Sequence, residues 1–182
     1  MRVGVLASGA GTNLQALLDE VHGREADVVA VGSDQPEAPA LARATRAGVP
    51  TAAFPRAAYA DRAARDAAMT AWLEERGVEL VVLAGYMAIL DEAFVARWSG
   101  RLVNVHPSLL PAFPGMRAIE DALEAGVETT GVTIHLVDEG LDTGVVLRQE
   151  SVPLEPRETL EERLHAVEHR LLPAVVREMI VQ

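Results

Sequence analysis

Short apolar runs rich in β-branched residues alternate with stretches of helical spacing along the first half of the chain. A strand is predicted from each apolar run, at residues 2–7, 27–33, 49–54, 78–84 and 101–105. Between these runs, apolar residues recur with the period of a helix face after residue 12, near 36–47 and across 59–76. The alternation predicts a Rossmann-like α/β fold, with helices flanking a mostly parallel, twisted sheet.

The pattern changes in the second half. Three prolines and a glycine fall within residues 107–115 and predict an irregular loop. A short helix is predicted near 117–125, followed by two strands at 130–137 and 145–154 that pair as neighbours at the sheet edge. A long final helix is expected to begin at Thr159, where the Thr-Leu-Glu-Glu pattern is that of a capping box.

Composition narrows the possible chemistry. The 182 residues are 49% hydrophobic and contain neither Cys nor Lys, which excludes thiol nucleophiles, disulfides, Schiff-base lysines and P-loop lysines. A net charge of −11 argues against a nucleic-acid partner, because such partners select basic surfaces. No apolar run reaches the roughly 20 residues of a membrane span. Met1 leads straight into a strand-like run, so we expect a cytoplasmic protein that binds small molecules.

The first candidate site is the glycine-rich turn Ser8-Gly9-Ala10-Gly11-Thr12-Asn13, between the first strand and the first helix. Glycines let such a turn aim main-chain N–H groups at a phosphate without any lysine. Leu14 stands where a dinucleotide-binding turn has its third glycine, which disfavours NAD. The alternative is a plain tight turn with Thr12 capping the helix.

The second candidate is the pair Asn104 and His106 at the end of the fifth predicted strand. Residues two apart in a strand point to the same face, so an amide and an imidazole are expected to converge there. The glycine-rich turn falls at the same edge of the sheet, where open α/β sheets bind ligands. The alternative is a histidine satisfied by main-chain partners beside a turn-forming asparagine.

A third candidate is the acidic loop 138–144. By itself it fits a solvated turn, and it lacks the ligand spacing of a calcium site. It gains interest because chemistry at His106 needs an acid to orient and charge the imidazole. No clustered set of metal ligands is present in the sequence, so we expect no metal.

Three further groups remain open or are assigned to structure. His135 alternates with apolar neighbours in a predicted strand, and His22 lies at a helix end, so both are interpreted as structural. Glu168 and His165 lie three residues apart and share a face of the final helix. That face points either at a ligand or at water.

Four segments together resemble the phosphoribosylglycinamide formyltransferases: VGVLASGAGTNLQALLD, ELVVLAGYMAIL, LVNVHPSLLPAFPG and TGVTIHLVDEGLDTGVVL. The resemblance covers essentially the whole chain. It implies transfer of a formyl group from 10-formyltetrahydrofolate to the amine of 5-phosphoribosylglycinamide (GAR) in purine biosynthesis. It also implies one formyltransferase domain over residues 1–182, with a phosphate-binding half at about 1–100 and a catalytic and folate half at about 101–182.

The resemblance assigns site residues by position. The catalytic residues it implies are Asn104, His106 and Asp142, and the GAR-binding residues are Gly11, Thr12, Asn13 and Glu168. The folate-binding residues it implies are Arg62, Met87, Ala88, Ile89, Leu90, Asn104, Asp138, Glu139, Gly140, Leu141 and Asp142. This chain departs from the family at Ala88, where relatives often carry Arg, and at Arg117 and Ala118, where they often carry histidine.

Several alternatives to this function are kept. A transfer-RNA formyltransferase is expected to add an RNA-binding domain, and a formyltetrahydrofolate hydrolase is expected to add a regulatory domain. A nicotinamide-dependent dehydrogenase would use an acid after the second strand, near Asp34, but the glycine spacing is wrong. A nucleotide-binding regulator would bind phosphate without turnover. The chain is expected to be a monomer or a homodimer.

Overall fold

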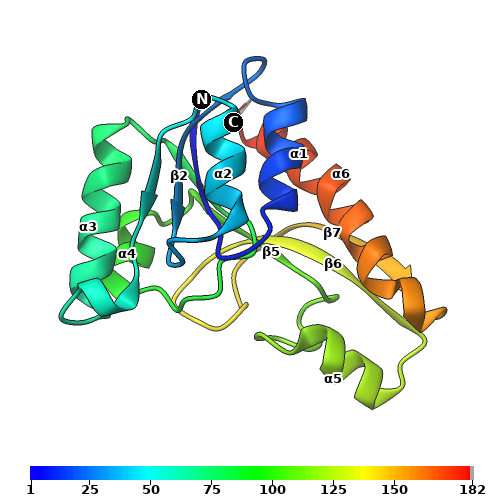
Figure 1. Cartoon of the computed structure of the whole chain (residues 1–182). Helices are drawn as coiled ribbons and strands as arrows, with labels where there is room; N and C mark the ends of the chain where they lie inside the picture. Colours follow the sequence, from blue (N-terminus) through cyan, green and yellow to red (C-terminus); the bar gives the residue numbers. More distant parts are fainter. Residues whose placement is uncertain (181–182) are drawn as a thin grey trace.

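A seven-stranded sheet forms the centre of the protein in a computed structural model that describes residues 1–180 (Figure 1). Its strands are β1 (Arg2–Leu6), β2 (Asp27–Ser33), β3 (Thr51–Ala53), β4 (Leu80–Leu83), β5 (Leu102–His106), β6 (Thr129–Leu136) and β7 (Val146–Pro153). The spatial order is β3-β2-β1-β4-β5-β6-β7. The first five of these pair in parallel, whereas β5–β6 and β6–β7 are antiparallel. The predicted fold class is confirmed.

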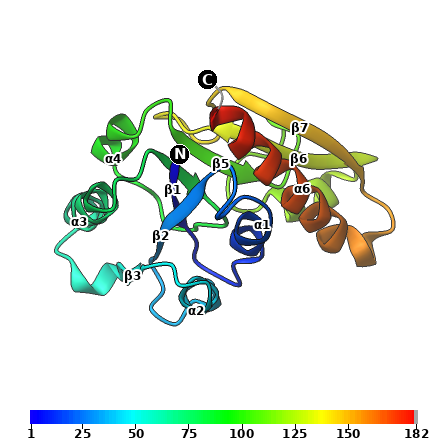
Figure 2. The same cartoon turned by 90° about the horizontal axis from the view of Figure 1, so that it is seen from above.

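Within residues 1–180, six α-helices cover the two faces of the sheet. They are α1 (Thr12–Glu20), α2 (Pro39–Arg46), α3 (Arg62–Glu75), α4 (Glu92–Arg97), α5 (Ala118–Ala125) and α6 (Leu160–Ile180). One buried cluster joins the sheet to α1, α2, α5 and α6, and a second joins the opposite face to α3 and α4 (Figure 2). Within residues 1–180, we find no helix with the length and apolar character that a bilayer crossing requires.

The elements match the sequence prediction with three differences. The strand predicted at 49–54 keeps only three residues in the sheet, because Pro50 has no N–H to donate. Helix α4 was not predicted, since six residues are too few to show an apolar period; the side chain of Asp91 caps it by accepting from Ala93 N. The capping box at Thr159 is wrong: Thr159 ends a 3₁₀ turn and its hydroxyl donates to the carbonyl of Pro156.

The strand order brings the ends of three strands together. The chain runs outward from β1 to β2 and β3 and then crosses back to place β4 on the other side of β1. The crevice beyond β1 and β4, where the strand order reverses, is the place where such sheets bind ligands. Ser8 N donates to Gly85 O at 3.0 Å and joins the segments that follow β1 and β4. The next strand, β5, carries Asn104 and His106 to the same edge.

Candidate active site

Asn104 and His106 lie at the end of β5, and Val105 between them is buried in the core. The antiparallel register with β6 sets Asn104 opposite His135 and His106 opposite Thr133. His106 is 4% exposed, so its ring is held among neighbouring groups and not in free solvent. The pleat of β5 therefore sets the face to which Asn104 and His106 point, and the register with β6 sets the residues opposite them.

Asp142 lies in the loop between β6 and β7, in contact with both histidines. Its Oδ2 is 3.5 Å from His106 Nδ1 and its Oδ1 is 3.5 Å from His135 Nε2. Gly115 N donates to Asp142 Oδ2 at 2.7 Å. The hydrogen bond with His135 is the main cause that lowers the pKa of Asp142 to about 2, helped by the Gly115 N–H and by charge on the histidines, while partial burial opposes it. Asp142 is therefore ionised at neutral pH.

The hydrogen bonds of His106 define its protonation. His106 Nε2 lies 2.8 Å from the carbonyl of Phe113, and a carbonyl can only accept, so Nε2 carries a hydrogen. The other ring nitrogen faces the Asp142 carboxylate.

His135 is a site residue that sequence analysis interpreted as structural. It is 1% exposed and lies between the amide of Asn104, at 3.2 Å from Nδ2, and the carboxylate of Asp142. Its Nδ1 donates to the carbonyl of Leu136 at 2.9 Å, and its Nε2 faces both the amide of Asn104 and the carboxylate of Asp142. The signal that could have found it is the strand register, which periodicity alone does not provide.

The glycine-rich turn forms the start of α1. Gly11 adopts φ 73°, in the left-handed region, and is the residue before the helix. A Cβ on Gly11 would lie 2.7 Å from Ala40 Cβ, so α2 packs directly against the turn. The first N–H groups of a helix have no partner within the helix. Thr12 begins the helix and no side chain caps it, so these donors remain available to an anion.

Asn13 and Glu168 meet across the turn, from α1 and α6. Asn13 Nδ2 donates to Glu168 Oε2 at 2.8 Å, with both residues buried. Burial is the main cause that raises the pKa of Glu168, while the Asn13 hydrogen bond and charge on His165 act against it. Within residues 1–180, Asn13 Oδ1 is buried and has no hydrogen-bond partner. This pair thus presents polar groups that a bound sugar could satisfy.

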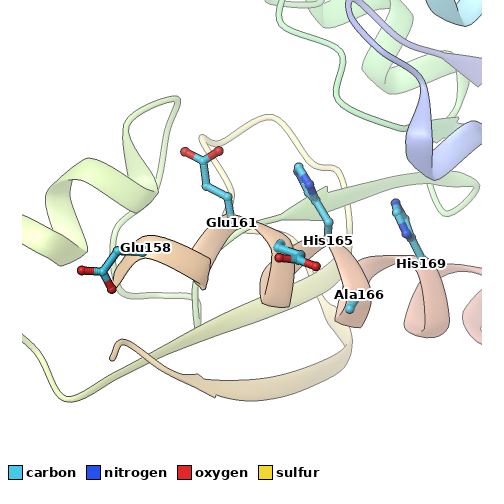
Figure 3. Close-up of a pocket in the computed structure, with 6 residues that line it drawn as sticks. Glu158, Glu161, His165, Ala166 and His169 are labelled. Atoms are coloured by element: carbon cyan, nitrogen blue, oxygen red, sulfur yellow. The ribbon is translucent and has the colours of Figure 1, made fainter. Parts of the chain in front are cut away.

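His165 and Glu168 do not point to the same place. A pocket of about 560 Å³ lies along α6, where Glu161, His165 and His169 project from one side of the helix (Figure 3). The rings of His165 and His169 stack with centroids 6.1 Å apart. Glu168 turns instead towards α1. Asp142 and the two histidines that contact it do not line this pocket. The volume of the pocket is therefore no evidence that the reaction takes place in it.

The residues expected on the folate side fall into two groups. Residues 87–90 lie between β4 and α4, with the Met87 and Ile89 side chains exposed. A second pocket, of about 290 Å³, lies between α4 and the acidic loop. Its lining residues are Val95, Ala96, Ser99, Val137, Asp138, Glu139 and Gly140. Sequence analysis identified the loop residues but missed the contribution of α4, which it did not predict.

Three arginines near the candidate site differ in their surroundings. Arg62 is exposed on the first turn of α3, and within residues 1–180 its side chain makes no hydrogen bond or ion pair. Arg65, one turn later, is buried and donates from Nη2 to the carbonyl of Ile89 at 2.8 Å. Arg117 pairs with Glu124 at 2.8 Å on α5. Its charge is therefore directed at its own helix.

Known proteins match this chain along nearly its whole length. A family model described as formyl transferase matches residues 1–176. Phosphoribosylglycinamide formyltransferase of Mycobacterium tuberculosis is 48% identical over 179 residues, which are 96% of this chain and 83% of that protein. The trifunctional purine biosynthetic protein adenosine-3 of Drosophila melanogaster is 46% identical over 94% of this chain, but the chain spans only 13% of its length.

The structural comparison agrees with the sequence comparison. The crystal structure of glycinamide ribonucleotide transformylase 1 from Symbiobacterium toebii superposes with a TM-score of 0.94 and 44% identity. The match covers 99% of this chain and 87% of that one. Sequence identity, coverage and fold agree, so this chain belongs to the phosphoribosylglycinamide formyltransferases of the formyl transferase family.

Proposed function

We propose that this chain transfers the formyl group of 10-formyltetrahydrofolate to the amine of GAR, giving formyl-GAR and tetrahydrofolate. One observation carries the proposal: the Asp142 carboxylate lies 3.5 Å from each of two buried histidines, and Asn104 lies against one of them. This cluster offers an amide donor, an imidazole and a fixed negative charge around one point. Such a set matches acyl transfer, in which charge develops on a carbonyl oxygen.

We assign Asn104 and His106 as the donors for that oxygen. His106 Nε2 contacts Phe113 O and Nδ1 faces Asp142, so His106 must exchange its contact with Phe113 for the oxygen when substrate binds. When the GAR amine adds to the formyl carbon, the oxygen gains negative charge, and each donor aimed at it is worth about 2.7–4 kcal/mol of barrier. The amide nitrogen of Asn104 carries two hydrogens, and only one of them can point at His135 Nε2, which leaves the other for the reacting oxygen. His106 contributes a charged donor when it is protonated.

The proposed role of Asp142 follows from its acidity. A general base works best when its pKa lies near the working pH. With a pKa of about 2, Asp142 is a weak base but a permanent negative charge. We therefore assign it to orienting and charging His106, and to holding the water that carries the proton from the incoming amine to the departing folate nitrogen.

The two substrates approach from different sides of the cluster. The GAR phosphate would bind at the start of α1, at Gly11 and Thr12, with the sugar beside Asn13 and Glu168. The folate would occupy the side formed by residues 87–90 and the 138–142 loop. The proposed division into a phosphate-binding half at about 1–100 and a catalytic and folate half at about 101–182 therefore has two exceptions, because residues 87–90 and Glu168 each contribute to the substrate of the other half.

The partners and location remain proposals of the same kind. We propose GAR and formylfolate as the small-molecule substrates, no metal in the reaction, and a cytoplasmic monomer or homodimer. Within residues 1–180, no group of three or more His, Asp or Glu side chains is placed to hold a metal ion. Activity after treatment with a chelator tests the metal prediction, and sedimentation tests the oligomeric state.

A two-substrate assay tests the function. The purified chain is mixed with GAR and formylfolate, and folate product is followed by its absorbance. A parallel reaction without GAR measures transfer to water. Rapid product formation that requires GAR supports formyl transfer, whereas equal rates in both reactions indicate a hydrolase. Binding of GAR without turnover would instead indicate a regulator.

A further inference from the structure

Residues 87–90 lack regular structure but are attached to the protein at alternate positions. Met87 N donates to Ser8 Oγ at 2.8 Å, at the beginning of the segment. In the middle, Ile89 O accepts from Arg65 Nη2 at 2.8 Å. At the end, Asp91 N donates to Asp66 Oδ2 at 2.6 Å. The last two contacts come from neighbouring residues of α3.

Arg65 and Asp66 form a buried ion pair. Arg65 Nε lies 2.6 Å from Asp66 Oδ1, and the two residues are 5% and 1% exposed. Burying two charges is expensive, and hydrophobic residues often stabilise a fold equally well in such a place. Here each member uses a second polar atom to hold the main chain of the 87–90 segment or its end. The pair therefore specifies where this segment lies.

The anchors leave the other side of the segment available for a ligand. Met87 and Ile89 expose 54% and 70% of their surface, which is unusual for large apolar side chains. In the part of the chain that the structure describes, the main-chain groups of Ala88 and Leu90 make no hydrogen bond. The segment thus combines apolar side chains with free main-chain donors and acceptors, as a site for a flat heteroaromatic ligand requires.

We infer that Arg65 and Asp66 are positioning residues for the folate side of the site, because they fix the path of residues 87–90 from beneath. This inference rests on the proposed function, in which that segment contacts the formylfolate. Neither residue touches substrate. The inference gives the buried Arg65 the role of shaping this side, in place of the exposed Arg62 one turn earlier.

The Ser8 anchor ties the same segment to the phosphate side. Ser8 Oγ accepts from Met87 N and donates to Asp34 Oδ1 at 2.5 Å. Asp34 is the acid that a dehydrogenase would need for a ribose, and here it holds a serine hydroxyl. Loss of the α3 anchors should therefore leave the beginning of the segment in place and release its middle and end.

The sharpest test is Arg65→Lys. Lysine keeps the positive charge beside Asp66, but one ammonium cannot reproduce contacts that two separate guanidinium nitrogens make. Arg97→Lys is the matched control, since Arg97 Nη2 joins α4 to Glu74 of α3 at 2.5 Å and lies on the protein surface. If Arg65→Lys does not fold, the double variant Arg65→Met with Asp66→Asn removes both charges, so that neither is left buried alone.

Three measurements are made on each purified full-length variant: KM for formylfolate, KM for GAR, and amide hydrogen exchange. For Arg65→Lys we expect KM for formylfolate to rise about tenfold, the effect of losing one hydrogen bond to a charged group. KM for GAR should stay at the wild-type value. Exchange at Asp91 should become faster, because its N–H loses a fixed acceptor. Arg97→Lys should match the wild type in all three.

Each outcome bears on a different claim. Unchanged KM for formylfolate in a folded Arg65 variant would overturn the positioning role, as would equal rises in both KM values. Failure of the wild-type chain to transfer formyl groups would instead overturn the proposed function. Faster exchange at Asp91 with normal KM for formylfolate would show that the anchor exists but does not position the site, and the inference would be rejected.

Discussion

The phosphate side and the catalytic cluster are built in opposite ways. The glycine-rich turn relies on main-chain N–H groups, a left-handed Gly11 and one buried contact between Asn13 and Glu168. The cluster around Asp142 relies on side-chain charge, with two histidines within 3.5 Å of one carboxylate. The first arrangement suits ground-state binding and the second suits charge that appears during reaction. A substitution in the glycine-rich turn should therefore impair GAR binding, whereas a substitution in the cluster around Asp142 should impair turnover.

The largest effect is expected in the cluster. Asp142→Asn and His106→Ala should each lower kcat by about 10²–10⁴-fold, since they remove a charged group from acid–base and electrostatic catalysis. KM for GAR should stay unchanged because the phosphate side is intact. Steady-state kinetics with both substrates, together with denaturant unfolding to verify the fold, check this expectation. Near-normal kcat in either variant would remove that residue from the mechanism.

Acid should weaken the cluster at a lower pH than the one at which Glu168, beside the turn, takes up its proton, because the pKa of Asp142 is lowered and that of Glu168 is raised. The pKa of Asp142 is lowered from 3.8 to about 2, so its ionised form stabilises the folded state above pH 3.8. That contribution, about 2 kcal/mol, should be lost as the pH falls from about 4 to about 2. Unfolding free energies measured across this range should show the loss in the wild type, and a flatter profile in Asp142→Asn. Parallel profiles in the two proteins would contradict the assignment.

Replacing a glycine of the turn by alanine should lower stability at Gly11 but not at Gly9. Gly11→Ala forces a left-handed residue and sets Cβ 2.7 Å from Ala40, so we expect a loss of about 1–3 kcal/mol in unfolding free energy and a higher KM for GAR. Gly9→Ala is the control, because nothing lies within 4 Å of its Cβ position. Similar behaviour of the two variants would show that backbone geometry at Gly11 is unimportant.

The smallest effect concerns a competing anion. Inorganic sulfate or phosphate should raise the apparent KM for GAR at millimolar concentration while leaving KM for formylfolate unchanged, since the N-terminus of α1 binds an anion through main-chain groups. Initial rates measured at several sulfate concentrations and constant ionic strength provide the test. Competition against folate, or none at all, would place the phosphate elsewhere.

Sequence alone gave a good account of the turn because its information is local. A glycine pair between a strand and a helix predicts a phosphate site with no knowledge of distant residues. The family resemblance and the fold class followed from similarly local motifs, and both are confirmed. The roles of the individual site residues stay predictions, although the structure brings Asn104, His106 and Asp142 around His135.

The site residues that sequence analysis missed could be recognised only from the register of the strands and from the burial of side chains. His135 looks like any histidine in an amphipathic strand until the β5–β6 pairing sets it opposite Asn104. Arg65 and Arg62 lie on the same helix and are equally plausible by residue type, but only Arg65 is buried. Helix α4 was hidden by its six-residue length.

The contact between Asn13 and Glu168 spans 155 positions of the chain. During synthesis on the ribosome, the turn emerges long before Glu168 is available to the first helix. A nascent chain that stops before α6 lacks the acid that faces Asn13, so the proposed sugar side of the site is incomplete. In the proposed arrangement, binding of the ribonucleotide therefore depends on the docking of α6 against α1.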